Sequence, residues 1–257
     1  MFAIIGIDGA TPSFIEENRE KLPTFDRLIK KHGIGTLLSP YKPITSAKCW
    51  TTIFTGVGPE KHNVNDFITR ERLIRRSDIT ATFVWELLEE QGAKVAALNI
   101  VATLPPINYN CEMMEWVPSN LSITEEEMVQ STNKLLSKSL EILDTKPDFF
   151  AVVFVSIDRA SHLFWGTEKV MERYKHIDFA VDQLLAKIDG DFMLVSDHGF
   201  QNTAQSIISG CESGHDLDVQ RKGGHHADGL ILSNFEPKPK TLKDVTPTIY
   251  RRFWQSK

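Results

Sequence analysis

The sequence predicts a three-layer α/β/α sandwich in which helices cover both faces of a mostly parallel central sheet. Two observations support this fold class. Short apolar segments rich in β-branched and aromatic residues alternate along the chain with longer segments that have the apolar spacing of helices. The chain of 257 residues also has about the length of one α/β core. We therefore expect a single domain over residues 1–257.

Five segments have the composition of strands that are buried on both faces, because nearly every residue in them is apolar. They are Phe2–Asp8, Ala93–Ile100, Phe149–Asp158, Asp191–Asp197 and Gly229–Ser233. Continuous apolar runs of this kind are typical of parallel strands covered by helices on both sides. We expect the five strands to share one parallel sheet.

Four segments repeat apolar residues every three or four positions, as helices packed on a sheet do. They are Thr80–Glu90, Thr124–Leu143, Val170–Lys187 and Leu242–Phe253. The second follows Ser122-Ile-Thr-Glu-Glu-Glu, which supplies a capping hydroxyl and an acidic first turn.

Two segments have the composition of connections. The stretch Gly199–Gly229 is rich in glycine and serine, and a loop of that length in a compact domain is expected to be functional. Residues 101–122 contain Pro105, Pro106 and Pro118 and are a candidate for a small lid, although nothing in them distinguishes a lid from an ordinary connection.

The composition excludes several classes of function. The chain has 29 Lys+Arg against 34 Asp+Glu, a formal charge of −5, so it lacks the basic face that a nucleic-acid polymer needs. Cys49, Cys111 and Cys211 are odd in number and without CxxC spacing, which predicts neither disulfides nor a thiolate zinc site. The longest apolar run, Phe149–Ile157, is too short to cross a membrane. We expect a cytoplasmic protein without a membrane partner.

Acidic and histidine side chains stand at or beside the ends of the predicted strands. In parallel sheets, reactive groups gather at the carboxyl edge, so these side chains are candidates for one site. Each also has an ordinary interpretation: a turn, a helix cap or a solvated histidine. The candidates are Asp8 before Gly9, Asp158 with His162 one helical turn later, Asp197 with His198, and His225, which we favour over His226 because it follows two glycines.

A hydroxyl pair precedes a possible helix between the first two strands. Thr45 and Ser46 stand before helix-compatible residues that end at Thr55-Gly56, which puts a hydroxyl at a helix N-terminus. Such a hydroxyl is an ordinary cap in most helices. It is also placed to attack an electrophile whose negative oxygens face the helix dipole.

Taken in order, these residues resemble the alkaline phosphatase superfamily, and most closely its type I phosphodiesterase/nucleotide pyrophosphatase branch. That branch has an Asp after the first strand, a Thr/Ser before a helix ending Thr-Gly-x-x-Pro-x-x-His, then Asp-x-x-x-His, Asp-His-Gly and Gly-x-His. Here the corresponding residues are Asp8, Ser46 through His62, Asp158 with His162, Asp197-His198-Gly199, and Gly223 through His225. The resemblance extends from the first predicted strand to the last.

The resemblance implies a site for two divalent metal ions, usually zinc. One ion would be held by Asp158, His162 and His225, and the other by Asp8, Asp197, His198 and the oxygen of Ser46. Mixed carboxylate and imidazole donors of this kind suit zinc or manganese. Ser46 would be the nucleophile of a phosphoester hydrolase with a covalent phospho-serine intermediate, and the substrate would be a small anionic phosphoester.

Two residues are candidate donors to the non-bridging phosphate oxygens. The pyrophosphatases have an Asn beside the transferred phosphoryl group, and Asn65 in His62–Phe67 is the candidate, in a register that the sequence leaves open. Lys48, two residues after Ser46, is the other candidate, because its long side chain can turn back toward a phosphate at the helix N-terminus. A solvated surface lysine is the alternative.

Related activities set the limits of the prediction. Sulfatases with this fold need Pro and Arg where this chain has Lys48 and Trp50, so we discount sulfatase activity. The chain is short for the superfamily, so the insertions that shape substrate selectivity are mostly missing and the substrate is weakly determined. A phosphodiester or nucleotide pyrophosphate is the first expectation. The alternatives are a phosphomonoester or phosphonate substrate, or a non-catalytic module that keeps the fold and binds metal.

Overall fold

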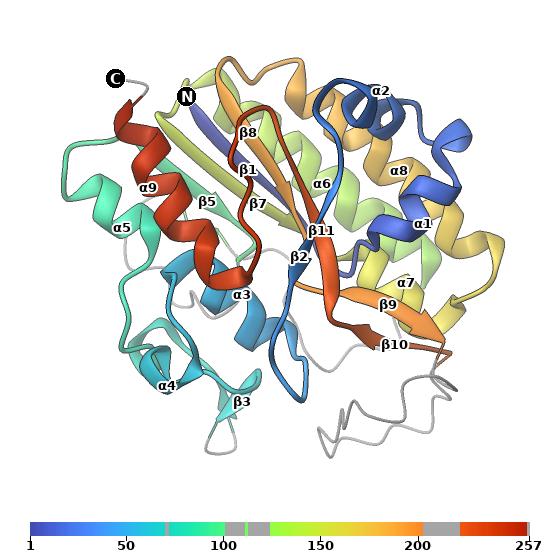
Figure 1. Cartoon of the computed structure of the whole chain (residues 1–257), viewed down its shortest axis with the longest axis horizontal. Coiled ribbons are helices and arrows are strands. Elements are labelled where there is room, and N and C mark those ends of the chain that lie inside the picture. The colour runs from blue at the N-terminus through green and yellow to red at the C-terminus, as the bar shows by residue number, and fades with distance from the viewer. Residues whose placement is uncertain (70–71, 101–110, 113–123, 203–221, 256–257) are drawn as a thin grey trace.

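The computed structural model describes residues 1–69, 72–100, 111–112, 124–202 and 222–255. Within these residues, a seven-stranded sheet of order β2-β11-β8-β1-β7-β5-β6 forms the middle layer (Figure 1). Helices cover both of its faces, so the predicted three-layer α/β/α class is confirmed.

Parallel strands form the centre of the sheet. β1 pairs with β7 on one side and β8 on the other, with Phe2 opposite Phe149 and Asp191. β5 pairs in parallel with β7 and with the short β6. The bounds are β1 Phe2–Ile7, β5 Val95–Leu98, β6 Cys111–Glu112, β7 Phe149–Phe154 and β8 Asp191–Val195.

The last strand corrects the expectation of five parallel strands. β11, Asp228–Ser233, runs antiparallel to β8, and β2, Gly35–Leu38, pairs antiparallel with β11. After β8 the described residues of the chain form an antiparallel pair, β9 (Gly199–Asn202) and β10 (Gly223–His226), and β10 leads directly into β11. The chain therefore returns to the sheet at the end where β8 finishes, and β11 runs in the opposite direction to β8.

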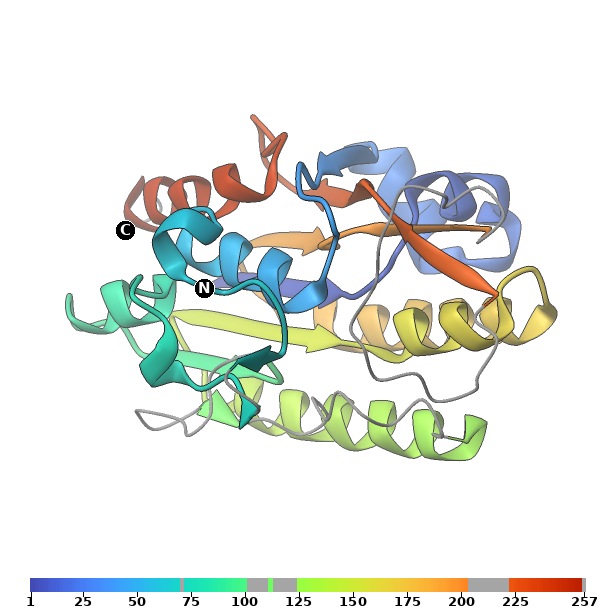
Figure 2. The same ribbon diagram turned by 90° about the horizontal axis from the view of Figure 1, so that it is seen from below.

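The two faces of the sheet carry different helices. Successive residues of a strand point to opposite sides of the sheet, so a hydrophobic core forms on each face. Ile4 belongs to the core that includes residues of α3, α5 and α9. Ile5 belongs to the core that includes residues of α1, α2, α6, α7 and α8. Figure 2 shows α6 and α9 on opposite sides of the strands. The bounds are α1 Pro12–Glu17, α2 Pro23–His32, α3 Ser46–Thr55, α4 Pro59–His62, α5 Val84–Glu89, α6 Glu125–Asp144, α7 Ser156–Phe164, α8 Glu168–Leu185 and α9 Val245–Gln255.

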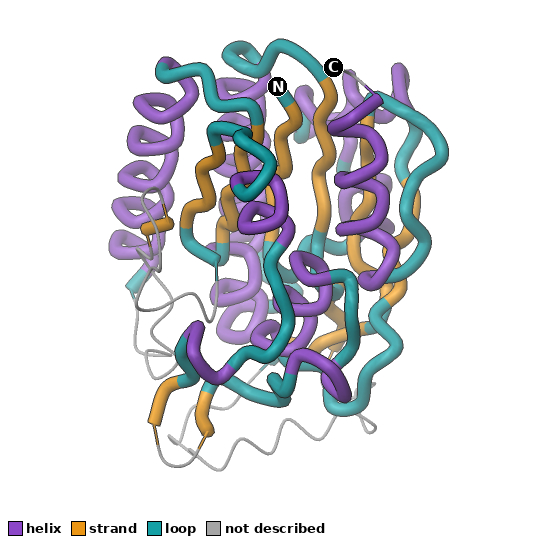
Figure 3. Tube along the Cα trace, turned by 90° about the vertical axis from the view of Figure 1, so that its left-hand side faces the viewer, coloured by secondary structure: helices purple, strands orange, loops and turns teal. Residues whose placement is uncertain are grey.

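The four expected helices are present as α5, α6, α8 and α9, and the first residues of the last expected helix form a 3₁₀ turn before α9. Three 3₁₀ turns and one small hairpin complete the described elements; Figure 3 shows the hairpin projecting at one end of the molecule. They are η1 Arg19–Lys21, η2 Arg76–Asp78, η4 Leu242–Asp244, and β3 Ile68–Thr69 with β4 Arg72–Leu73.

Two expected connections turn out differently. The segment Gly199–Gly229 is not only loop, since β9 and β10 lie in it and the start of β11 is included. The lid expected over residues 101–122 falls outside the described residues, except for β6, which adds an edge strand to the sheet. No helix in the described ranges combines the length and hydropathy required to span a membrane.

Asp178 of α8 supports the packing of α2 and gives a test of the fold. Its carboxylate accepts hydrogen bonds from the buried backbone amides of Thr24 (3.1 Å) and Phe25 (2.8 Å) at the start of α2. We expect Asp178→Ala to lower the free energy of unfolding by about 1–3 kcal/mol in urea titrations, because both amides lose their acceptor. The control is Asp182→Ala, which removes an exposed pair with Arg27 and should cost about 0–1 kcal/mol. Equal stability of the two variants would contradict the capping role.

Candidate active site

The carboxyl edge of the sheet brings the candidate residues together. Asp8 follows β1, Asp197 and His198 follow β8, and Asp158 and His162 lie in the first turns of α7 directly after β7. Ser46 is the first residue of α3, which ends at Gly56 in the left-handed conformation, as the Thr-Gly pattern predicts. His225 comes from β10. The topology therefore gathers all seven expected metal-site residues from five parts of the chain.

The three histidines make the same kind of hydrogen bond. Each directs Nδ1 at a backbone carbonyl oxygen, where a proton on Nδ1 can be donated. Each Nε2 is then left with a lone pair that can accept a proton or bind a cation. The Nδ1–O distances are 3.3 Å from His162 to Gly223, 3.1 Å from His198 to Gly199 and 2.9 Å from His225 to Ile44.

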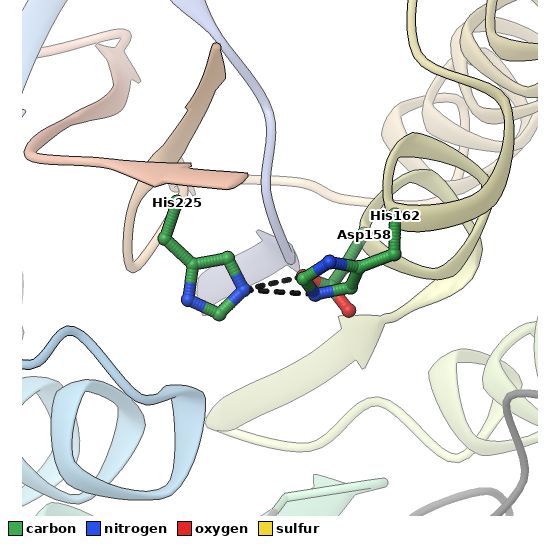
Figure 4. Close-up of side chains that lie close together, drawn as sticks. All are labelled: Asp158, His162 and His225. Carbon is green, nitrogen blue, oxygen red and sulfur yellow. Dashed lines mark hydrogen bonds and ion pairs between the residues drawn. The ribbon is translucent and has the colours of Figure 1, made fainter. Parts of the chain in front are cut away.

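The Nε2 atoms converge on one carboxylate oxygen of Asp158. Oδ1 lies 3.4 Å from Nε2 of His225 and 3.5 Å from that of His162 (Figure 4). It lies 3.8 Å from Nε2 of His198. The Nε2 atoms of His162 and His225 are 3.0 Å apart. Donors around one tetrahedral zinc ion lie about 3.3 Å apart, given its usual bond lengths. The spacing of this first group fits a bound cation.

A second group lies next to the first and includes the candidate nucleophile. Oδ1 of Asp8 lies 3.4 Å from Nε2 of His198, and Oδ2 of Asp197 lies 3.3 Å from the same nitrogen. The hydroxyl of Ser46 is 3.1 Å from His198 Nε2 and 3.4 Å from Asp8 Oδ1. Asp158 Oδ1 is close enough to serve this group as well.

Burial of the carboxylates favours either their protonation or a positive charge close to them. In the described part of the chain, Asp158 Oδ1 and both Asp197 carboxylate oxygens are buried and accept no hydrogen bond. Burial, together with the charges of Asp197 and Asp158, raises the pKa of Asp8 well above its usual range. Burial and the Asp158 charge raise the pKa of Asp197 to about 7. Unpaired buried carboxylates are costly, so this donor set fits divalent cations.

The neighbouring histidines help to lower the pKa of both Asp158 and His198. Burial alone would raise the pKa of Asp158, but the neighbouring His162 and His225 outweigh it and hold that pKa below its usual range. Burial and the charge of His225 hold the pKa of His198 well below its usual value. A neutral His198 keeps the lone pair on Nε2 available to a metal ion.

The two candidate phosphate donors contact the segment that precedes Ser46. Lys48 is buried; its Nζ donates to the carbonyl oxygen of Pro43 at 3.0 Å and lies 5.9 Å from the ring centre of Tyr41. Asn65 has an exposed side chain, and its backbone carbonyl accepts a hydrogen bond from Thr45 Oγ1 at 2.9 Å. Both residues therefore contact the segment that leads into Ser46, Lys48 through its side chain and Asn65 through its backbone.

Sequence reasoning missed several contacts that hold the site. The indole of Trp50 donates to Asp8, and the ring of Phe200 lies 4.9–5.7 Å from the rings of the three histidines. A signal for Trp50 was present, since it lies four residues after Ser46 and shares its helix face. Backbone acceptors such as Ile44 leave no signal in the sequence.

The fold is the alkaline phosphatase-like α/β fold that the sequence predicts, and a cluster of carboxylates and imidazoles lies at the edge of its sheet. Residues 2–250 match the family model for type I phosphodiesterase / nucleotide pyrophosphatase. The chain belongs to this family. No curated protein gives a significant sequence match.

Solved structures share the fold at low sequence identity. Murine ectonucleotide pyrophosphatase / phosphodiesterase 5 is 11% identical, with a TM-score of 0.66 over 98% of this chain and 94% of that protein. Phosphonoacetate hydrolase from Sinorhizobium meliloti 1021, in complex with phosphonoacetate, is 13% identical, with a TM-score of 0.62 over 78% of this chain. The match spans 56% of the hydrolase, so this chain corresponds to little more than half of it.

Proposed function

We propose that the chain is a two-metal phosphoester hydrolase that cleaves small phosphodiesters or nucleotide pyrophosphates through a covalent phospho-Ser46 intermediate. The main support is the convergence of the Nε2 atoms and buried carboxylate oxygens next to the Ser46 hydroxyl. Asp158, His162 and His225 would hold one cation. Asp8, Asp197, His198 and Ser46 would hold the other, and zinc or manganese suits both sets.

Ser46 carries the proposed chemistry. When bound, the divalent cations would lower the pKa of the Ser46 hydroxyl and stabilise charge on the phosphoryl oxygens. The Ser46 hydroxyl gives up its proton to solvent as its oxygen attacks phosphorus, the bond from phosphorus to the leaving oxygen breaks, and the leaving oxygen takes up a proton from solvent. A water molecule then attacks the phospho-serine, the bond from phosphorus to Ser46 breaks, and the serine oxygen takes the proton that the attacking water gives up.

A hydrolysis screen tests the function. Metal-free protein would be reloaded with Zn²⁺ or Mn²⁺ separately and assayed with bis-p-nitrophenyl phosphate, p-nitrophenyl phosphate, nucleotide pyrophosphates and phosphonoacetate. We expect metal-dependent cleavage of the diester or the pyrophosphate. Preference for the monoester or phosphonoacetate would change the substrate class, and bound metal without turnover of any compound would favour a non-catalytic module.

The phosphate donor can be assigned by comparing two variants. We expect Lys48→Ala to lower kcat/KM by about tenfold to a thousandfold (~1.4–4 kcal/mol). The reason is that the Lys48 ammonium group, if it leaves the carbonyl oxygen of Pro43 and binds a phosphoryl oxygen, would stabilise negative charge in the transition state. Asn65→Ala should have the smaller effect. Metal content, measured in both variants, should not change. Normal turnover of Lys48→Ala beside a severe loss in Asn65→Ala would return the role to Asn65.

A further inference from the structure

We propose that Trp50 is a positioning residue, which fixes the Asp8 carboxylate so that one of its oxygens faces Ser46 and the cation held there. This inference rests on the proposed function. It assigns a role to a side chain outside the expected ligand set.

The two carboxylate oxygens of Asp8 have different partners. Trp50 Nε1 donates to Asp8 Oδ2 at 2.9 Å, and both side chains are buried. The other oxygen, Oδ1, faces the Ser46 hydroxyl and His198 Nε2, each at 3.4 Å. Because an indole N–H only donates, it favours the ionised carboxylate and leaves Oδ1 to the site.

Helix α3 presents Trp50 and Ser46 to the same target. The two residues are four positions apart, so they share one face of the helix, and both reach Asp8. The nucleophile and the residue that orients its neighbouring carboxylate therefore belong to one rigid element. A shift of α3 would move both together.

Strand β1 is shaped to receive the indole. Gly6 lies two residues before Asp8, on the same side of the strand. A Cβ atom at Gly6 would lie only 2.7 Å from Cη2 of Trp50 and 2.8 Å from Cγ2 of Val153, so a larger residue there would displace the ring. The absence of a side chain at Gly6 gives the indole its place beside Asp8.

Aromatic packing holds the other side of the ring. Trp50 stacks on Phe54 with ring centres 5.8 Å apart, Phe54 contacts Trp85 at 5.3 Å, and Trp85 stacks on Phe83 at 4.5 Å. A ring packed between this row and β1 has little freedom to rotate. Its N–H is therefore directed at Asp8 before any ligand arrives, as a metal-orienting contact requires.

Zinc binding by the Trp50→Phe variant tests the proposal, since phenylalanine keeps a ring but has no N–H. Metal-free protein would be titrated with Zn²⁺ in competition with a chromophoric chelator. We expect one of two cations to bind about 10–100-fold more weakly and the other to be unchanged, with a lowered kcat that excess Zn²⁺ partly restores. The matched control, Trp85→Phe, replaces another tryptophan of the same row of aromatic rings. This variant should bind both cations as the wild type does. Equal binding in the two variants would overturn the proposal.

A second measurement separates this proposal from the proposed function. The indole N–H resonance of Trp50, identified by its loss in Trp50→Phe, should move upfield in metal-free Asp8→Ala protein, because its carboxylate acceptor is gone. Unchanged resonances of the other tryptophans would show that the fold is intact. A wild-type protein that binds no cation would contradict the proposed function, but the shift would still decide whether Trp50 holds Asp8. An unmoved resonance would overturn the positioning role.

Discussion

Replacing Ser46 with alanine is expected to lower kcat by roughly three to six orders of magnitude, the usual cost of removing a covalent nucleophile. The reason is geometric. The Ser46 hydroxyl lies within 3.4 Å of Asp8 and His198 in the candidate metal-binding cluster, whereas the hydroxyl of its neighbour Thr45 donates a hydrogen bond to the backbone oxygen of Asn65. Steady-state kinetics on the preferred substrate of the screen would measure the loss.

Thr45→Ala is the matched control, because it removes a hydroxyl from the adjacent residue. Its turnover should stay near that of the wild type. Acid-quenched wild-type protein should carry phosphate on the peptide containing Ser46, detectable by mass spectrometry, and Ser46→Ala should not. Near-normal turnover of Ser46→Ala with a severe loss in Thr45→Ala would move the nucleophile by one residue.

The sequence patterns identified the centre of the fold because burial on both faces leaves a clear mark. β1, β7 and β8 are apolar almost throughout, and helices cover both of their faces. The direction of β11 left no such mark, since an apolar strand has the same composition whether it runs parallel or antiparallel. The edge strand β2 was missed because three of its four residues, Gly35, Thr36 and Leu38, are not buried.

The candidate metal-site residues could be proposed because residue type, strand ends and motif order agree at each of them. Their hydrogen-bond partners could not, because Ile44, Gly199 and Gly223 act through backbone oxygens, which every residue has. In the same way, the position of Lys48 in the first turn of α3 did not determine where its side chain points. That direction depends on where the chain puts the carbonyl of Pro43, five residues earlier.

Replacing Asp158 with alanine is expected to have the second-largest effect, a loss of about two to four orders of magnitude in kcat together with loss of bound cation. The family resemblance implies that Asp158 holds a single cation with His162 and His225. In the structure, its Oδ1 also lies 3.8 Å from Nε2 of His198, so it belongs to both candidate groups. Elemental analysis of reloaded wild-type protein should find about two cations per chain.

The number of cations that Asp158→Ala keeps will show whether this carboxylate serves one group or both. Its charge helps to raise the pKa of Asp8 and Asp197, so its removal lets these two ionise more easily and favours a cation at the second group. One retained cation would therefore mean separate sites, and none would mean that Asp158 is shared. The control is Asp228→Ala, which removes a carboxylate that is 48% exposed and pairs with His226. It should keep both cations and normal turnover, whereas the same result for Asp158→Ala would contradict both arrangements.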